Sequence, residues 1–270
     1  MTGVTVTGQA PTWEHRTARA AHWADLVRVL AVKNFRQRYL RSRLGVVWAL
    51  IQPLLQAAVL SFVFVVIFKV KSVPHYPLYV LSGIMSWQFF QQSALAGTSS
   101  IVDNAGLVRK VAVPKVVFPI AAVGGVGLVF VLQLVILIGA GAVLGTLHAT
   151  SPLLLLLAIP LEAAFALSLS VLCTSIHVNV RDIRFVVESG LLMAFYLTPV
   201  LWDLNRLSPT LRAVMEWNPM LGVLSLVRGA ILGRAVDWTG VGSAFLCAAV
   251  LGVVGAWVFR RRSPEFADLA

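Results

Sequence analysis

The sequence has few charged residues and none of the short motifs that mark common enzymes. Only 12% of its 270 residues are charged, whereas soluble domains hold about 25%. It contains no GxxxxGK[ST] phosphate loop, no HExxH and no GxSxG, and its five histidines have no metal-ligand spacing. The two cysteines, Cys173 and Cys247, fall in apolar runs at different depths, so we expect no disulfide. These absences disfavour an enzyme, and we expect this chain to bind no cofactor.

What the sequence has instead is long apolar stretches. Hydrophobic residues make up 59% of the chain. A bilayer core of about 30 Å requires about 20 apolar residues in each spanning helix, and unbroken runs such as residues 153–158 lack the alternation of barrel strands. We therefore predict an all-α membrane protein with six transmembrane helices, at residues 46–68, 78–97, 116–144, 152–176, 185–202 and 241–259.

The spans are spread evenly, so we expect one domain over residues 1–270. It would consist of a basic N-terminal segment (1–45), a six-helix membrane bundle (46–259) and a short tail (260–270). Threading six spans puts sixteen of the 22 basic residues on the side of the N-terminus. The positive-inside rule then predicts that both termini are cytoplasmic. Basic charge placed in this way reports topology and contact with anionic lipid, and it argues against nucleic-acid binding.

The segment before the first span, residues 24–44, is compatible with a helix and strongly basic. Two interpretations stay open. It is either a juxtamembrane anchor to anionic lipid, or an amphipathic helix that lies on the inner leaflet and gates access of a phosphate-bearing lipid. The second follows from the paired hydrogen bonds that arginine makes to phosphate oxygens, here from Arg36, Arg38, Arg41 and Arg43.

In the predicted cytoplasmic connection at residues 98–115, the sequence indicates a short helix of about ten residues. Asp103 and Asn104 are candidate caps for its start, and Pro114 would end it. This segment is either an ordinary loop or a helix presented to a cytoplasmic partner.

The last long connection, residues 203–238, contains two apolar pieces on the outer side. Residues 211–217 and 220–232 are separated by Asn218 and Pro219, and each piece is too short to span a bilayer. They predict re-entrant or interfacial helices.

Polar side chains inside the predicted spans are few. Glu162 lies near the middle of the fourth span, where an ionisable group costs several kcal/mol and usually faces a bundle interior or a cavity; it has either a structural role or a substrate contact. On the second span, Gln88, Gln91 and Gln92 accompany aromatic residues. Amides and aromatic faces suit sugars, but aromatic residues also gather at membrane interfaces, so a sugar path and an interfacial belt both remain open.

Three clusters of residues follow each other over about residues 26–260. The first holds Arg38, Tyr39, Arg41, Ser42, Leu44, Gly45, Trp48, Pro53 and Leu54. The second holds Gly83, Trp87, Phe89, Phe90, Asn104, Leu107, Lys110, Pro114 and Pro119. The third holds Arg181, Asp182, Ile183, Pro199, Val200, Asn218, Pro219 and Arg228. Together they resemble the permease subunit of type-2 ABC transporters, specifically the polysaccharide exporters of the O-antigen and teichoic-acid kind.

The resemblance implies a subunit of the bacterial inner membrane that forms a homodimer. Each copy would bind a separate cytoplasmic ATPase subunit, which holds ATP and Mg, and the dimer would export a lipid-linked glycan. It also implies that the basic segment is a gate helix and that residues 203–238 hold outer gate helices. Coupling to the ATPase would fall to Asn104, Leu107, Val108, Arg109 and Lys110. We further expect the translocation path to be lined by Trp87, Phe89, Phe90, Gln91, Glu162, Phe195 and Tyr196.

Three other functions remain as alternatives. A type-2 ABC permease for a drug, haem or a lipid shares the helix plan. A membrane transferase acting on polyprenyl phosphate would need close acids or a metal site, and Asp182 stands alone in the sequence. A channel or an ion-coupled carrier would be expected to have more buried charges and an internal repeat, and we find neither in the sequence.

Overall fold

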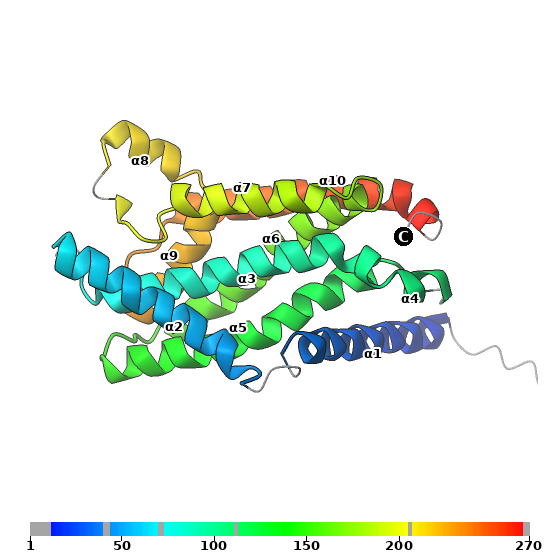
Figure 1. Cartoon of the computed structure of the whole chain (residues 1–270), viewed down its shortest axis with the longest axis horizontal. Helices are drawn as coiled ribbons and strands as arrows, with labels where there is room; N and C mark the ends of the chain where they lie inside the picture. Colours follow the sequence, from blue (N-terminus) through cyan, green and yellow to red (C-terminus); the bar gives the residue numbers. More distant parts are fainter. Residues whose placement is uncertain (1–11, 40–43, 70–72, 111–112, 205–206, 267–270) are drawn as a thin grey trace, which may run out of the picture.

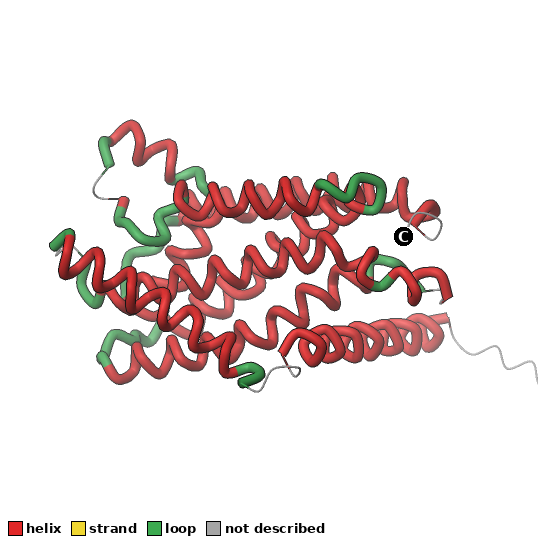
Figure 2. Tube along the Cα trace, viewed as in Figure 1, coloured by secondary structure: helices red, strands yellow, loops and turns green. Residues whose placement is uncertain are grey.

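The computed structural model describes residues 12–39, 44–69, 73–110, 113–204 and 207–266, with the side chains of the first helix described from Trp23 onward, and every regular element in these ranges is a helix (Figures 1 and 2). The all-α prediction is therefore confirmed. In chain order the elements are α1 (Thr12–Tyr39), α2 (Val47–Ser61), the π-helical η1 (Phe62–Ile67), α3 (Tyr76–Asp103), α4 (Ala105–Lys110), α5 (Val117–Val143), α6 (Ser151–His177), α7 (Ile183–Leu197), α8 (Pro209–Met215), α9 (Pro219–Leu232), α10 (Trp238–Arg262) and the short 3-10 turn η3 (Ser263–Glu265).

Four helical stretches are long and apolar enough to cross a bilayer: Val47–Ile67, Val117–Val143, Ser151–His177 and Trp238–Glu265. They correspond to four of the six predicted spans. The other two predicted spans fall on α3 and α7. Helix α3 has 28 residues, but its glutamines and serines lower its mean hydropathy. Helix α7 has 15 residues, or about 22 Å at 1.5 Å per residue, which is shorter than a bilayer core.

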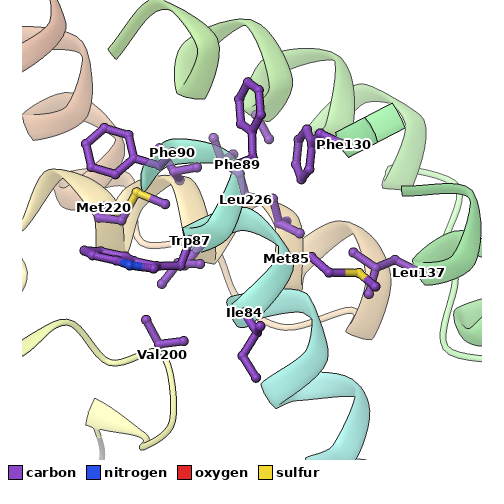
Figure 3. Close-up of a cluster of buried hydrophobic side chains, with 14 of the residues drawn as sticks. Ile84, Met85, Trp87, Phe89, Phe90, Phe130, Leu137, Val200, Met220 and Leu226 are labelled. Carbon is purple, nitrogen blue, oxygen red and sulfur yellow. The ribbon is translucent and has the colours of Figure 1, made fainter. Parts of the chain in front are cut away.

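Helix α3 runs through the middle of the molecule (Figure 1) and contacts α2, α5, α6, α7 and α9. Most of its side chains are buried, including Ile84, Met85 and Trp87. Figure 3 shows these residues packed among side chains from α5, α9 and the segment that follows α7. Because α3 faces protein on most sides, its low hydropathy does not conflict with a place inside a membrane bundle.

The bundle has two distinct ends (Figure 1). At one end, here the α4 end, α1 and the last turns of α10 pack beside α4, and their apolar side chains form one cluster that includes Leu30, Val108, Phe118, Phe259 and Phe266. At the other end, the α8 end, α9 packs against α3, α6 and α10, and α8 lies at the edge of the molecule. Three of the basic segments that the sequence assigns to one side lie at the α4 end: Arg109 and Lys110 in α4, Arg184 at the start of α7, and residues 260–262 at the end of α10.

The apolar pieces predicted in the last long connection are both helical. Asn218 begins α9, since its side chain accepts a hydrogen bond from the Met220 amide at 3.0 Å. Gly233 ends the helix with a φ of 63°, a conformation that glycine adopts without strain. Nearly every residue of α9 is buried, and its 14 residues reach about 21 Å. It is therefore a half-length helix inside the protein.

Two helices leave broad apolar surfaces uncovered. In the stretch Val47–Ile67, only 17% of the most apolar window is buried. Helix α7 exposes Phe185, Val186, Leu192 and Met193. Apolar surface on this scale marks contact with lipid or with another protein chain.

Of the helix predicted between Asn104 and Val113, the structure describes Ala105–Lys110 as α4, and residues 111 and 112 lie outside the described residues. In Figure 1, α1 runs along the long axis of the molecule and not across it. Its place on the inner leaflet stays a prediction. The prediction of unpaired cysteines is confirmed, since Cys173 and Cys247 are both free.

Candidate functional site

A cleft of about 500 Å³ opens near the α4 end, between α1, α3 and α5, and we call it the α1–α3 cleft. Its volume lies within the range of about 300–1,000 Å³ that is common for small-molecule sites. Its lining is largely polar and includes Asn34, Gln37, Arg38, Gln92, Ser99, Ser100, Asp103, Asn104 and Arg184. Donors and acceptors from three or more elements therefore converge on one space.

Helix α1 is held in place by contacts to both walls of the cleft. Arg38 Nη1 donates to Gln92 Oε1 of α3 at 3.2 Å, and Lys33 Nζ donates to Asn104 Oδ1 at 3.0 Å. On the α5 side, Gly125 allows close approach, because a Cβ atom there would lie 3.0 Å from the Ala31 carbonyl oxygen. The cleft is thus a built feature of the packing between these helices.

Of the four predicted gate arginines, the structure describes two. Arg36 and Arg38 are both exposed, and Arg38 lines the α1–α3 cleft. Arg41 and Arg43 lie outside the described residues. Arg184, at the start of α7, was not predicted for this site but joins its lining; its position beside Asp182 in the third sequence cluster was the available signal.

The predicted coupling residues surround α4. The Asn104 side chain does not cap α4 in the manner expected, since its Nδ2 donates to the Ser100 carbonyl at 2.8 Å and its Oδ1 accepts from Lys33. Val108 is only 5% exposed and packs in the cluster of the α4 end, whereas Leu107 is 37% exposed. Arg109 and Lys110 are exposed beside it. Of the two predicted apolar anchors, only Leu107 faces outward.

The aromatic residues predicted for a translocation path lie in two settings. Trp87, Phe89 and Phe90 are 3–4% exposed. Phe89 stacks on Phe130 of α5 with ring centroids 4.4 Å apart, and Phe90 stacks on Phe165 of α6 at 4.7 Å. Figure 3 shows these rings pointing into the core. In this chain they pack between α3, α5 and α6.

Three more of the predicted path residues, Phe195, Tyr196 and Gln91, are less buried. Phe195 is half-buried and its ring lies 5.7 Å from that of Trp87. Tyr196 is exposed and Gln91 is half-buried. Gln91 lies on α3, and Phe195 and Tyr196 lie in the last turn of α7.

Comparison with known proteins gives the family of the chain. Residues 25–232, more than half of the chain, match the family described as ABC-2 type transporter. The chain belongs to this family. It is 26% identical over 249 residues to the O-antigen export system permease protein RfbA of Klebsiella pneumoniae, which covers 91% of this chain and 95% of the relative. It is also 26% identical over 245 residues to the protein of the same name from Myxococcus xanthus, covering 88% and 93%.

These matches confirm the resemblance seen in the sequence and the assignment of a transport subunit. The residues matched to the ABC-2 family include all of those that line the α1–α3 cleft, and they also include α4 and α9. Within the described residues, no group of three or more His, Cys, Asp or Glu could hold a metal ion.

Residues that carried the resemblance meet at the α8 end of this permease. Arg228 of α9, 5% exposed, donates from Nη1 to the Pro199 carbonyl at 2.8 Å and from Nη2 to the Val200 carbonyl at 2.7 Å. Its guanidinium carbon lies 3.6 Å from the centre of the Tyr79 ring. A Cβ on Gly83 would lie 2.7 Å from Arg228 Nη2, so only glycine leaves room. We call this group the Arg228 cluster.

Further bonds tie the segment after α7 to the same place. Tyr79 donates from its hydroxyl to the Trp202 carbonyl at 2.8 Å, and Asn218 Nδ2 donates to Thr198 Oγ1 at 3.1 Å. Sequence reasoning did not single out Tyr79 or its other neighbour Arg234. A tyrosine at the start of the second predicted span, with two arginines in and after residues 220–232, was the signal that could have found them.

Glu162 of α6 is fully buried, and neither carboxyl oxygen has a hydrogen-bond partner within the described residues. An ionised carboxylate in such surroundings would be very costly. We therefore expect the neutral acid. Its position is in the protein interior and not at a described cleft, and a contact with substrate stays a prediction.

Proposed function

We propose that this permease exports an O-antigen-like polysaccharide, carried on a lipid, as the membrane subunit of an ABC transporter. The observation that carries the proposal is the match to O-antigen export permeases over about nine-tenths of both chains. The polar α1–α3 cleft supports it, because a glycan and its phosphate group need many hydrogen-bond donors and acceptors.

In this proposal the α4 end faces the cytoplasm of a bacterial cell, and the protein spans its inner membrane six times. The charge distribution supports this orientation, because the basic segments at the α4 end follow the positive-inside rule. Helix α3 would be the second span and α7 the fifth. Although α7 is short, the turn at residues 198–203 that follows it could complete the crossing inside protein.

Two copies would form the working permease, each with one ATPase subunit that binds ATP and Mg. The uncovered apolar faces of α2 and α7 support a homodimer, since such faces need lipid or protein against them. The glycan path would then run between the copies. Tyr196, Phe195 and Gln91 are the predicted path residues that lie nearest such an interface, whereas Trp87, Phe89 and Phe90 would support it from behind.

The α1–α3 cleft would receive the phosphate end of the lipid-linked glycan. Arg38 and Arg184 line it from opposite elements, and the remaining gate arginines Arg36, Arg41 and Arg43 would guide the substrate from the membrane surface. Each charge-assisted contact would contribute about 1.5–3 kcal/mol if dry and much less if solvated. Teichoic acid, which also carries phosphate, remains a possible cargo within this proposal.

Deletion of the gene in its host tests the proposal. We expect loss of surface polysaccharide and accumulation of its lipid-linked form inside the cell, both reversed by the wild-type gene. An Arg38→Glu, Arg184→Glu double variant should restore export poorly while still binding the ATPase in a pull-down. Arg260→Glu, an exposed arginine outside the cleft, is the matched control. Unchanged surface polysaccharide in the deletion strain would refute the proposed function.

A further inference from the structure

A second pocket, of about 550 Å³, opens at the α8 end, and we call it the outer pocket. It lies between the outer part of α3, the buried helix α9 and the connection that leads into α10. The residues important to the argument are Tyr79, Asp203, Arg228, Arg234, Asp237 and Trp238. Its volume is typical of a small-molecule site, and it lies at the end of the molecule opposite the α1–α3 cleft.

The charges around the outer pocket are balanced. Three arginines and three acids line it, and two of the arginines are already paired: Arg234 Nη2 lies 2.7 Å from Asp203 Oδ2, and Arg212 Nε lies 3.0 Å from Glu216 Oε1. An anion would therefore gain little from these arginines and would meet three carboxylates. A neutral ligand rich in hydroxyl groups fits better, because each hydroxyl can donate to a carboxylate and accept from a guanidinium.

Several pocket side chains are fixed by one bond and have another polar atom left over. Asp237 Oδ1 accepts from the Thr239 and Gly240 amides and so caps α10, but Asp237 Oδ2 has no partner within the described residues. Arg234 Nη1 and Arg228 Nε are also buried without a partner in that part of the chain. Buried polar atoms of this kind are rare. Here one acceptor and two donors with unmet hydrogen-bonding capacity belong to side chains that line the outer pocket.

An aromatic face completes the pocket. Trp238, the first residue of α10, lines it and is 63% exposed, so its ring is open to a ligand. The Tyr79 ring is already covered by Arg228 at 3.6 Å and lies 5.0 Å from the Arg234 guanidinium. Indole faces stack on the apolar C–H face of pyranose rings, while charged side chains bind the hydroxyls at the ring edge.

We propose that the outer pocket binds a neutral pyranose residue of the exported glycan as it leaves the permease. Asp237 and Arg234 bond its hydroxyls, and Trp238 stacks on its ring. The assignment of this ligand rests on the proposed function, but the site itself rests on the geometry at the α8 end. A weak site of this kind would hold the emerging chain and oppose its return.

The test uses the full permease with its ATPase in lipid nanodiscs. Saturation-transfer NMR would measure contact with methyl glycosides of glucose, galactose, mannose and rhamnose, with inorganic phosphate as a competitor. Trp238→Ala removes the stacking face. Trp217→Ala is the matched control, because Trp217 is equally exposed at 65%, lies at the same end and does not line the pocket. Asp237→Asn keeps the capping oxygen and replaces the free acceptor by a donor.

We expect at least one glycoside to bind. Trp238→Ala should weaken its binding by about 3- to 10-fold, the effect of one aromatic face, whereas Trp217→Ala should leave it unchanged. If Trp238→Ala fails to fold, a similar loss in Asp237→Asn decides in favour. Equal binding in both tryptophan variants, no binding of any glycoside, or displacement by phosphate would overturn the proposal.

Binding can be judged without transport. A complex that exports glycan and binds no glycoside rejects the outer pocket alone. A complex that binds glycoside through Trp238, in a strain whose surface polysaccharide does not depend on the gene, rejects the proposed function and keeps the site.

Discussion

Arg228 holds the α8 end of the permease together, and its removal should destabilise the fold strongly. The side chain is 5% exposed and donates two charged hydrogen bonds, to the Pro199 and Val200 carbonyls. Each bond of this type contributes about 1.5–3 kcal/mol, which gives about 3–6 kcal/mol for the pair. Arg228→Met also removes the cost of burying a charge. We therefore expect a net loss of about 3 kcal/mol in the free energy of unfolding.

Thermal unfolding of the purified chain, followed by tryptophan fluorescence, measures this loss. At about 2–4 °C per kcal/mol for a chain of this size, Arg228→Met should lower Tm by about 6–12 °C. Arg228→Lys should lower it by an intermediate amount, because an ammonium lacks the planar fork that reaches both carbonyls. Arg260→Met, at an exposed site, should change Tm by less than about 2 °C. If Arg228→Met unfolds at the same temperature as this control, the reasoning about the Arg228 cluster is wrong.

Three further outcomes are expected. The isolated permease should hydrolyse no ATP and gain activity only when its ATPase is added; robust hydrolysis by the chain alone would contradict its role as a transport subunit. Leu107→Asp should release the ATPase in a pull-down without changing Tm, whereas Val108→Ala, in the core, should cost about 1–3 kcal/mol of stability; equal effects of the two variants on Tm would refute this division of α4. Phe90→Ala should lower export and should also reduce the free energy of unfolding by about 3–5 kcal/mol, with a lower Tm. Tyr196→Ala should lower export without changing Tm. A lower Tm in Tyr196→Ala would count against a path along α7.

The sequence alone was enough to predict the helical class, because apolar runs such as residues 117–143 exceed the length of a bilayer core. The spans that it predicted at α3 and α7 stay predictions, since neither helix is among the four long apolar stretches. A hydropathy average treats every residue of α3, including its glutamines, as if it faced lipid. In the structure, much of that helix packs against α5, α6 and α9. Burial inside a bundle depends on neighbours that are distant in sequence, and a local average does not contain them.

The candidate site shows the same limit at the level of single residues. Leu107 and Val108 are adjacent apolar residues on one short helix, and the sequence treats them alike. Their directions differ because α4 packs against α1, α5 and the end of α10, which selects one face of the helix for the core. Asn104 likewise has a side chain suited to capping a helix, but it is hydrogen-bonded instead to Lys33 and to the Ser100 carbonyl in the last turn of α3.

Helix α3 connects the two functional ends of the permease. One end leads through Asn104 directly into α4, where a partner would dock. The other end carries Tyr76 and Tyr79, whose hydroxyls bond the Leu201 and Trp202 carbonyls at 2.7 and 2.8 Å. The helix between them has 28 residues without a break, or about 42 Å. We expect a continuous buried helix to move as a rigid body, so a displacement of α4 would reach the segment between α7 and α8 without any chain of intermediate side chains. The sequence keeps α3 free of internal proline after Pro77, which preserves this rigidity along its whole length.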